Sequence, residues 1–338
     1  MKKRILVTGA SGTVGFELLK QLSEKKLYEI TAFDIDTKAV RKKLSSLRGK
    51  LTIIYGDISR KTDLEMVTKN TDAAIHLAAI IPPLADENPA LAEKVNVHGT
   101  ENLIRSLEEN SPDAFFIYAS SVSVYGDRLK NPDIKTSDEL KPSEGDEYAK
   151  TKIKTEKILQ QSKLNWTIFR LAAIMGNHKI SKLMFHMPLE TSVEICTPAD
   201  TARAFVNAIE KREQLQNRIF NLGGGEQCRI SYRDLLQKSF SIYGMGNLDF
   251  PEKAFAEKNF HCGNYVDGDE LNDILNFRQD DLTSYFKTVK KGVNPTVKLI
   301  TRLVNPFVKK QLLKQSEPYE AFRNNDTKML EGYFNDTK

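Results

Sequence analysis

Cysteine is scarce in this sequence. Cys196, Cys228 and Cys262 are the three cysteines among 338 residues, with no Cys-x-x-Cys pair and no nearby histidine cluster. This pattern argues against a disulfide framework and a zinc site, so we expect no metal. Apolar runs are also short, and none reaches the roughly 18–20 residues needed to cross a bilayer. The basic N-terminus leads into a brief apolar stretch ending in glycines, which favours a strand over a secretion signal and predicts a cytoplasmic protein.

Acidic residues are missing from one part of the chain. The formal net charge is +5, but residues 287–316 contain basic side chains and no acidic ones. Within 295–314, apolar residues recur at helix spacing with Lys and Arg between them and Pro306 as a kink. Such a helix can lie on an anionic membrane surface, or it can pack on the protein or on a dimer partner. No aromatic residues interleave with the basic ones as in nucleic-acid binding, so we expect no nucleic-acid partner.

Short apolar segments alternate with helical patterns along the first two thirds of the chain. This alternation predicts right-handed βαβ units, and therefore an α/β fold with a Rossmann-type doubly wound parallel sheet. We expect a cofactor-binding domain at 1–176, completed by about 200–225, and a smaller C-terminal substrate lobe from 177–199 and 226–290. A basic helical extension and a polar tail should occupy 291–338, and the sequence leaves open whether the tail after 316 is ordered. The expected strands are 4–8, 29–33, 51–55, 73–77, 114–119, 166–171 and 218–222.

A glycine-rich loop follows the first expected strand and opens a helix. It reads Gly9-Ala-Ser11-Gly12-Thr13-Val14-Gly15. Glycines at these positions allow a tight turn, close approach of a pyrophosphate to the backbone, and close helix–sheet packing. The helix N-terminus would then offer free N–H groups to the phosphates.

An acidic residue, Asp34, ends the second expected strand, 19 residues after Gly15. A carboxylate there can bind the adenosine ribose hydroxyls and would repel a 2′-phosphate, so NAD is predicted over NADP.

Two further strand ends add expected cofactor contacts. Asp57 and Ile58 follow the third strand, where a carboxylate can reach the adenine amino group. Leu77, Ala78 and Ala79 follow the fourth strand and leave little side-chain bulk where the cofactor would cross the sheet edge. Together with the glycine loop and Asp34, these residues outline a cofactor site along the carboxyl ends of the strands.

A tyrosine and a lysine stand four residues apart in Tyr148-Ala-Lys-Thr-Lys152, which places them on one face of a helix. A phenol has a reference pKa of about 10, and a neighbouring ammonium with the positive nicotinamide ring should lower it. Tyr148 can then exchange a proton with a substrate oxygen while hydride moves at the same carbon. Lys152 would also hold the nicotinamide ribose.

Taken in order, these motifs resemble an extended short-chain dehydrogenase/reductase of the NAD-dependent epimerase/dehydratase family. The resemblance covers about residues 4–285 and includes Asn96-Val-His-Gly-Thr100, Ser120-Ser121-Val-Ser-Val-Tyr125-Gly and Asn-Leu-Gly-Gly-Gly. Helical patterns predict one long helix over 88–110 and another over 146–161. The resemblance implies that Ser121 is the catalytic hydroxyl, that Asn96 contacts the cofactor site, and that the chain forms a homodimer through these two helices. Ser120, Ser123 and Tyr125 are expected to be structural.

Departures from the family pattern bear on the substrate. Val122 and Ser123 occupy the positions where the sugar 4,6-dehydratases of this family carry an Asp-Glu pair, so dehydration is not expected. Ala173 replaces an asparagine with which related nucleotide-sugar epimerases contact their substrate, and the basic residues usually found before a later Asp-Asp pair are missing around Asp200. A diphosphate substrate would lose two anchors.

Three functions remain in order of preference. The first is an NAD-dependent oxidoreductase acting on a secondary alcohol or ketone of a small, sterol-like or flavonoid-like substrate. The second is an NAD-dependent (nucleotide-)sugar epimerase using the same residues. The third is a non-catalytic, NAD-binding regulatory protein, although Tyr148 and Lys152 are both retained.

Overall fold

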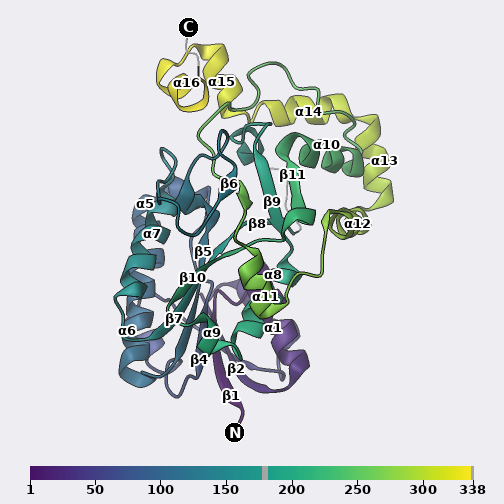
Figure 1. Cartoon of the computed structure of the whole chain (residues 1–338). Coiled ribbons are helices and arrows are strands. Elements are labelled where there is room, and N and C mark those ends of the chain that lie inside the picture. The colour runs from purple at the N-terminus through teal and green to yellow at the C-terminus, as the bar shows by residue number, and fades with distance from the viewer. Residues whose placement is uncertain (177–181, 336–338) are drawn as a thin grey trace.

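The computed structural model describes residues 1–176 and 182–335. Seven parallel strands form the main sheet in the order β10-β7-β5-β4-β1-β2-β3 (Figure 1). Their bounds are β1 Lys3–Thr8, β2 Tyr28–Asp34, β3 Thr52–Tyr55, β4 Ala73–His76, β5 Phe115–Ser121, β7 Asn165–Leu171 and β10 Arg218–Leu222. All seven predicted strands are present, and the order reverses beside β1, as in a Rossmann-type sheet. The predicted fold class is therefore confirmed.

Helices cover both faces of this sheet. Leu18 of α1, Phe205 of α8 and Leu271 of α11 belong to the core on one face, whereas Leu103 of α6 and Leu159 of α7 belong to the core on the other. Because both faces are buried, the central strands read as continuous apolar runs. The helices of this part are α1 Thr13–Lys25, α2 Lys38–Leu44, α3 Lys61–Leu64, α4 Leu84–Glu87, α5 Pro89–Ala92, α6 Thr100–Asn110, α7 Glu147–Gln160, α8 Pro198–Ala208, α9 Arg212–Leu215 and α11 Asp269–Leu275.

The long helix expected over 88–110 is present and runs without a break from 89 to 110, but its middle departs from α-helical geometry. Between α5 and α6 the chain forms a π-helical segment, η2, over Glu93–Gly99. A would-be Cβ on Gly99 would lie 2.7 Å from the Ile58 side chain, so the segment packs closely against the turn after β3. Single π-helical turns of this kind are frequent at functional sites.

A smaller C-terminal lobe lies beyond the carboxyl ends of the strands. It contains the sheet β11-β9-β8, the strand pair β12-β6 and the helices α10 and α12 to α16 (Figure 1). These elements are β6 Asp133–Ile134, β8 Ala173–Ile174, β9 Ser192–Cys196, β11 Arg229–Ser231, β12 Asn264–Tyr265, α10 Tyr232–Tyr243, α12 Leu282–Gly292, α13 Pro295–Leu303, α14 Asn305–Leu313, α15 Glu317–Asn324 and α16 Thr327–Tyr333. Residues 177–181, at the start of the predicted lobe, lie outside the described residues.

The polar tail, whose order the sequence leaves open, forms two helices in residues 317–333. Ser316 caps α15 by accepting a hydrogen bond from the Tyr319 N–H at 3.0 Å. Ala321, Leu330 and Phe334 form a small buried cluster between α15 and α16. These three apolar residues are too widely spaced in a polar sequence to stand out, yet they order the segment by packing together.

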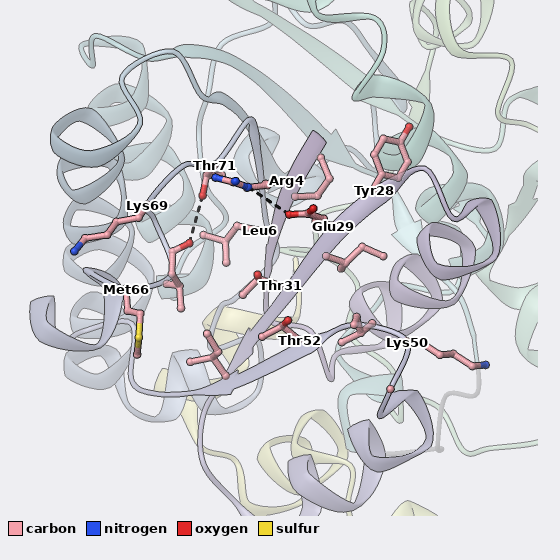
Figure 2. A pocket seen from close by; sticks show the side chains of 16 residues that line it. Arg4, Leu6, Tyr28, Glu29, Thr31, Lys50, Thr52, Met66, Lys69 and Thr71 are labelled. Atoms are coloured by element: carbon pink, nitrogen blue, oxygen red, sulfur yellow. Dashed lines mark hydrogen bonds and ion pairs between the residues drawn. The ribbon is translucent and has the colours of Figure 1, made fainter. Parts of the chain in front are cut away.

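A hollow lies over β1 to β3 on the face shared with α6 (Figure 2). Arg4 and Glu29 cross it with a hydrogen bond of 3.3 Å between Nε and Oε2, and Thr31 and Thr52 point into it. None of the predicted cofactor-binding or catalytic residues lines it. The candidate site is therefore elsewhere, at the carboxyl ends of the strands.

Candidate active site

The glycine loop joins β1 to α1. Gly9 has a φ of +67°, and a Cβ there would lie 2.6 Å from the Ala78 backbone nitrogen. A Cβ on Gly15 would lie 2.3 Å from the carbonyl oxygen of Gly9, so α1 packs directly on the turn. The first turn of α1 holds no acidic residue, and its N-cap, Gly12, makes no side-chain capping bond. The N–H groups of this turn are therefore placed to bind an anion.

A cavity of about 250 Å³ lies beside this loop. It brings together most of the predicted cofactor residues, which come from four separate strand ends. Its lining comprises Gly9, Ser11, Gly12, Phe33, Asp34, Ile35, Gly56, Asp57, Ile58, Leu77, Ala78, Ala79, Ile80 and Val95. Apolar walls with a few carboxylates suit an adenosine group, so the residues present fit the adenosine end of NAD.

Asp34 stands at the rim of this cavity and is fixed by the backbone. Its Oδ2 accepts a hydrogen bond from the Ser11 N–H at 2.7 Å, and its Oδ1 accepts one from the Ile35 N–H at 2.8 Å. Asp57 Oδ1 accepts from the N–H and the hydroxyl of Ser59, at 2.9 and 2.8 Å. Both carboxylates keep unused lone pairs, so a ribose or adenine contact remains a prediction for each.

Asn96 lies behind the cofactor cavity instead of lining it. Its Oδ1 accepts from the Ile80 N–H at 2.7 Å, and its Nδ2 donates to the Ile80 carbonyl at 2.9 Å and to the Thr151 hydroxyl at 3.0 Å. These bonds occupy both amide donors of a buried side chain. Asn96 therefore ties the loop after β4 to helix α7, and direct cofactor contact by its side chain stays a prediction.

The expected catalytic residues meet at the end of β5. Asp146 caps α7 by accepting from the Ala149 N–H at 2.8 Å, which fixes the helix that carries Tyr148 and Lys152. Ser121 ends β5, its hydroxyl accepts a hydrogen bond from the Ser123 N–H at 3.2 Å, and it lies near enough to Tyr148 to influence the pKa of that residue. Lys152 Nζ donates to the Ala119 carbonyl at 2.7 Å and lies 5.6 Å from the centre of the Tyr148 ring. The three predicted side chains are thus adjacent.

The pKa of Tyr148 is raised, whereas the sequence leads us to expect a lowered pKa. Burial is the main cause that raises the pKa of Tyr148 above its usual value, the Asp146 carboxylate adds to it, and the Ser121 hydroxyl opposes it. Burial also lowers the pKa of Lys152 from 10.5 to about 7, against the attraction of Glu156. The sequence pattern reveals the pairing of Tyr148 with Lys152 but not that Lys152 is buried and Tyr148 partly buried, and loss of solvent dominates both shifts.

A buried ion pair holds α7 against the sheet, and sequence analysis missed it. Glu156 accepts from Arg170 of β7 through two bonds, 3.0 Å from Nε and 2.7 Å from Nη2. Ser120 of β5 donates to the same carboxylate at 2.5 Å. Arg170 also donates to the Tyr125 hydroxyl at 2.8 Å. Ser120 and Tyr125 thus have the structural positions expected of them. The spacing of Glu156, one helical turn beyond Lys152, was the available signal.

A second cavity, of about 370 Å³, begins at Ser121 and extends into the C-terminal lobe. Val122 and Ala173, two of the departures from the family pattern, both line it. Its described lining contains no Lys, Arg, Asp or Glu. The lining comprises Ser121, Val122, Ala172, Ala173, Ile174, Met175, Gly176, Leu183, Met184, Met187, Tyr232, Leu235, Leu236, Ser239, Phe240, Tyr243, Phe260, His261, Cys262, Tyr285 and Val289. We call this cavity the apolar pocket.

His261 is a polar residue of the apolar pocket that sequence analysis did not identify. Its Nδ1 lies 3.0 Å from Asp146 Oδ2, and its ring stacks on Phe260 with the ring centres 4.7 Å apart. Asp146 therefore contacts both the catalytic helix and the pocket wall. No motif surrounds His261, because it lies in the irregular part of the chain where helix and strand periodicity is lost.

Comparisons with known proteins agree with this geometry. A model of the NAD dependent epimerase/dehydratase family matches residues 5–223, and the chain belongs to this family. The family is NAD-dependent, which confirms the predicted cofactor.

Curated relatives include a UDP-glucose 4-epimerase of Vibrio cholerae, 33% identical over 52% of this chain and 53% of that protein. A 3-beta-hydroxysteroid dehydrogenase of Mycolicibacterium neoaurum is 33% identical over 46% of this chain and 42% of that protein. This chain therefore spans about half the length of these relatives or less. A solved UDP-glucuronic acid 4-epimerase from Bacillus cereus, in complex with UDP-glucuronic acid and NAD, superimposes with a TM-score of 0.70 at 20% identity, over 85% of this chain and 99% of that one. At this identity the likeness shows the fold.

Proposed function

We propose that this protein is an NAD-dependent oxidoreductase that transfers hydride at a secondary alcohol or ketone of an apolar substrate. The observation that carries the proposal is the apolar pocket, which begins at Ser121 and has no cationic side chain in its described lining. A nucleotide diphosphate would need cationic or well-placed donor groups there. A mostly hydrocarbon substrate with one oxygen needs only apolar walls and the hydroxyls of Ser121 and Tyr148.

In the proposed reaction, the chain's own residues manage the proton. When bound, NAD supplies the hydride donor or acceptor next to the reacting carbon. Ser121 would donate a hydrogen bond to the substrate oxygen, which strengthens as negative charge develops there. Because the pKa of Tyr148 is raised, this residue keeps its proton and is set to donate it to the oxygen of a ketone as hydride reaches the carbon. The same residue would take the proton back when the alcohol is oxidised, and ketone reduction is the direction in which the proposal is tested.

The test is the oxidation of NADH in the presence of a panel of fused-ring and long-chain ketones. The loss of the NADH absorbance measures the rate. Tyr148→Phe should lower kcat/KM by at least about 100-fold without changing NADH binding. Tyr28→Phe is a matched control, since Tyr28 Oη binds Glu210 at 3.1 Å at the other end of the sheet. The proposal fails if no apolar ketone is reduced, or if Tyr148→Phe is as active as the control.

An epimerase is the second candidate, favoured by the relative from Vibrio cholerae. Such an enzyme would use the same serine, tyrosine and lysine, and it would return the hydride to the same substrate. Measuring the nicotinamide content of the purified protein and its exchange with added NAD separates the two. Slow exchange together with conversion of a UDP-sugar would favour the epimerase. Ready exchange together with ketone reduction would favour the oxidoreductase.

The assembly and location of the protein are also part of this proposal. We propose a homodimer through α6 and α7, which pack side by side on one flank of the sheet (Figure 1). We also propose a cytoplasmic location with peripheral membrane contact through 295–314. Light scattering of the purified chain tests the dimer, and cell fractionation tests the location.

A further inference from the structure

The helices α13 and α14 expose a row of large apolar side chains. None of the nine residues of α13 is buried. Leu303 is 75% exposed and Phe307, in α14, is 63% exposed. The row, which we call the apolar ridge, consists of Val297, Leu299, Ile300, Leu303, Val304 and Phe307. An amphipathic helix in a globular protein normally turns its apolar stripe toward the core, so this orientation calls for a partner outside the chain.

The two helices are nevertheless attached to the C-terminal lobe. Val308, Leu312 and Leu313 of α14 pack against the core that contains α10 and α12. A Cβ on Gly244, at the end of α10, would lie 2.5 Å from the carbonyl oxygen of Lys298, so α13 is held close to α10 through its backbone. The ridge therefore belongs to an anchored part of the fold, at the outer edge of the lobe (Figure 1).

The segment that carries the apolar ridge is rich in basic residues. Residues 287–316 carry eight basic side chains and no acidic one: Lys287, Lys290, Lys291, Lys298, Arg302, Lys309, Lys310 and Lys314. Among the ion pairs of residues 1–176 and 182–335, Lys309 with Asp249 is the one that involves this group. The remaining cations are thus available to an external anion. A segment that exposes large apolar side chains and carries basic residues without acidic ones matches an anionic lipid bilayer, where each cation near the headgroups adds to the binding.

Other occupants fit this surface less well. A second copy of the chain, related by a two-fold axis, would place the same cations opposite one another and repel itself. Single-stranded nucleic acid would need several aromatic platforms, and the ridge carries one aromatic ring, Phe307. No helix of the described residues is both long and apolar enough to span a bilayer.

We propose that α13 and α14 dock this protein on the surface of an anionic lipid bilayer, with the apolar ridge inserted at the headgroup boundary. Helix α12 links this segment to the apolar pocket, because Tyr285 and Val289 line the pocket and its last turn carries Lys290 and Lys291, which belong to the basic group. Docking would bring one wall of the pocket to the bilayer. The docking could let the protein collect a ketone dissolved in the bilayer, and this use rests on the proposed function. The docking itself does not depend on the proposed function.

The test is co-sedimentation of the full chain with vesicles of phosphatidylcholine alone or mixed with phosphatidylglycerol. The double variant Leu303→Ser, Phe307→Ser should bind the anionic vesicles at least about tenfold more weakly, since both side chains would no longer enter the bilayer. The matched control is Leu27→Ser, Met66→Ser, which changes side chains that are 61% and 72% exposed far from the ridge. Lys290→Gln with Lys291→Gln should weaken binding by about tenfold or more, and added salt should weaken it further.

Several outcomes would overturn the proposal. Equal binding by the ridge variant and the control would show that the ridge does not insert. Equal binding to neutral and anionic vesicles would show that the basic residues do not contribute to binding. No binding by the parent chain would show that the protein does not dock on a bilayer. A parent dimer that the ridge variant converts to a monomer would identify a second copy as the occupant. NAD binding by each variant keeps these outcomes separate from a failure of the proposed enzyme activity.

Discussion

Replacing Glu156 with glutamine changes few atoms but should lower the free energy of unfolding substantially. The Glu156 carboxylate accepts both bonds of a bidentate pair with Arg170, and the two side chains are 1% and 4% exposed. Glutamine keeps the shape but removes the negative charge, and its amide nitrogen can no longer accept a bond from the guanidinium. The charge of Arg170 then stays buried without a counter-charge.

The cost follows from this burial. Removing one partner of a buried ion pair typically costs about 3–5 kcal/mol, because the other charge stays desolvated. A control on the same helix is available: Lys154 pairs with Glu93 at 2.9 Å, but these side chains are 56% and 34% exposed. Exposed pairs contribute about 0–1 kcal/mol, so Glu93→Gln should change the free energy of unfolding very little. Glu156→Gln should also lower the pKa of Lys152 further, since the Glu156 charge raises it.

Urea unfolding of the purified variants measures the stability change caused by Glu156→Gln and the one caused by Glu93→Gln. We expect a lower midpoint for Glu156→Gln with an unchanged slope, and an essentially unchanged midpoint for Glu93→Gln. Replacing both partners, with Glu156→Leu and Arg170→Met, should recover part of the loss by removing the stranded charge. If Glu156→Gln lowers the free energy of unfolding no more than Glu93→Gln does, the reasoning from burial is refuted.

Three further predictions concern the cofactor side of the sheet. Burial lowers the pKa of His76 from 6.5 to about 3, so the folded state resists protonation and stability should be lost as the pH falls through this window. His76→Gln should lose less stability between about pH 7 and about pH 4 in urea unfolding, and an equal loss in both proteins would contradict this. Asp34→Ala should weaken NAD binding at least about tenfold and reduce the preference over NADP in calorimetric titrations, and an unchanged preference would assign the discrimination to other residues. Gly15→Ala should cost about 1–3 kcal/mol in thermal unfolding, because its Cβ would lie 2.3 Å from the Gly9 carbonyl oxygen, whereas Gly292→Ala, with nothing within 4 Å, should be neutral.

The sheet could be predicted from the sequence because its central strands, β4, β5 and β7, are buried on both faces. Each of the seven strands is a short apolar run next to a glycine or a polar turn, which is the simplest local signal in the chain. The helices were harder where packing outweighs local preference. The apolar spacing of 88–110 predicts one helix, but the chain makes a π-helical segment at 93–99, where Gly99 packs against Ile58.

The candidate site was predictable to the extent that it uses motifs. The glycine loop, Asp34, Tyr148 and Lys152 have characteristic spacings, and the structure brings them to the same edge of the sheet. His261 has no such spacing, since it reaches the site from the C-terminal lobe through a contact with Asp146. Tertiary contacts between distant segments leave no local pattern, which is why the pocket wall and the pKa of Tyr148 had to come from the structure.

The apolar pocket draws Ser121 from the end of β5 and Val122 from the turn that follows it, and all its other described lining residues lie at 172 or beyond. The residues expected to bind the cofactor and move the proton all lie before 153. Selection can therefore act on the two parts separately: mutations that reshape the pocket leave the glycine loop and Tyr148 untouched. A family built in this way can acquire new substrates by drift in its second half while its first half stays almost fixed. An engineer could follow the same route by exchanging the pocket-lining segments at 172–187 and after 223 between relatives.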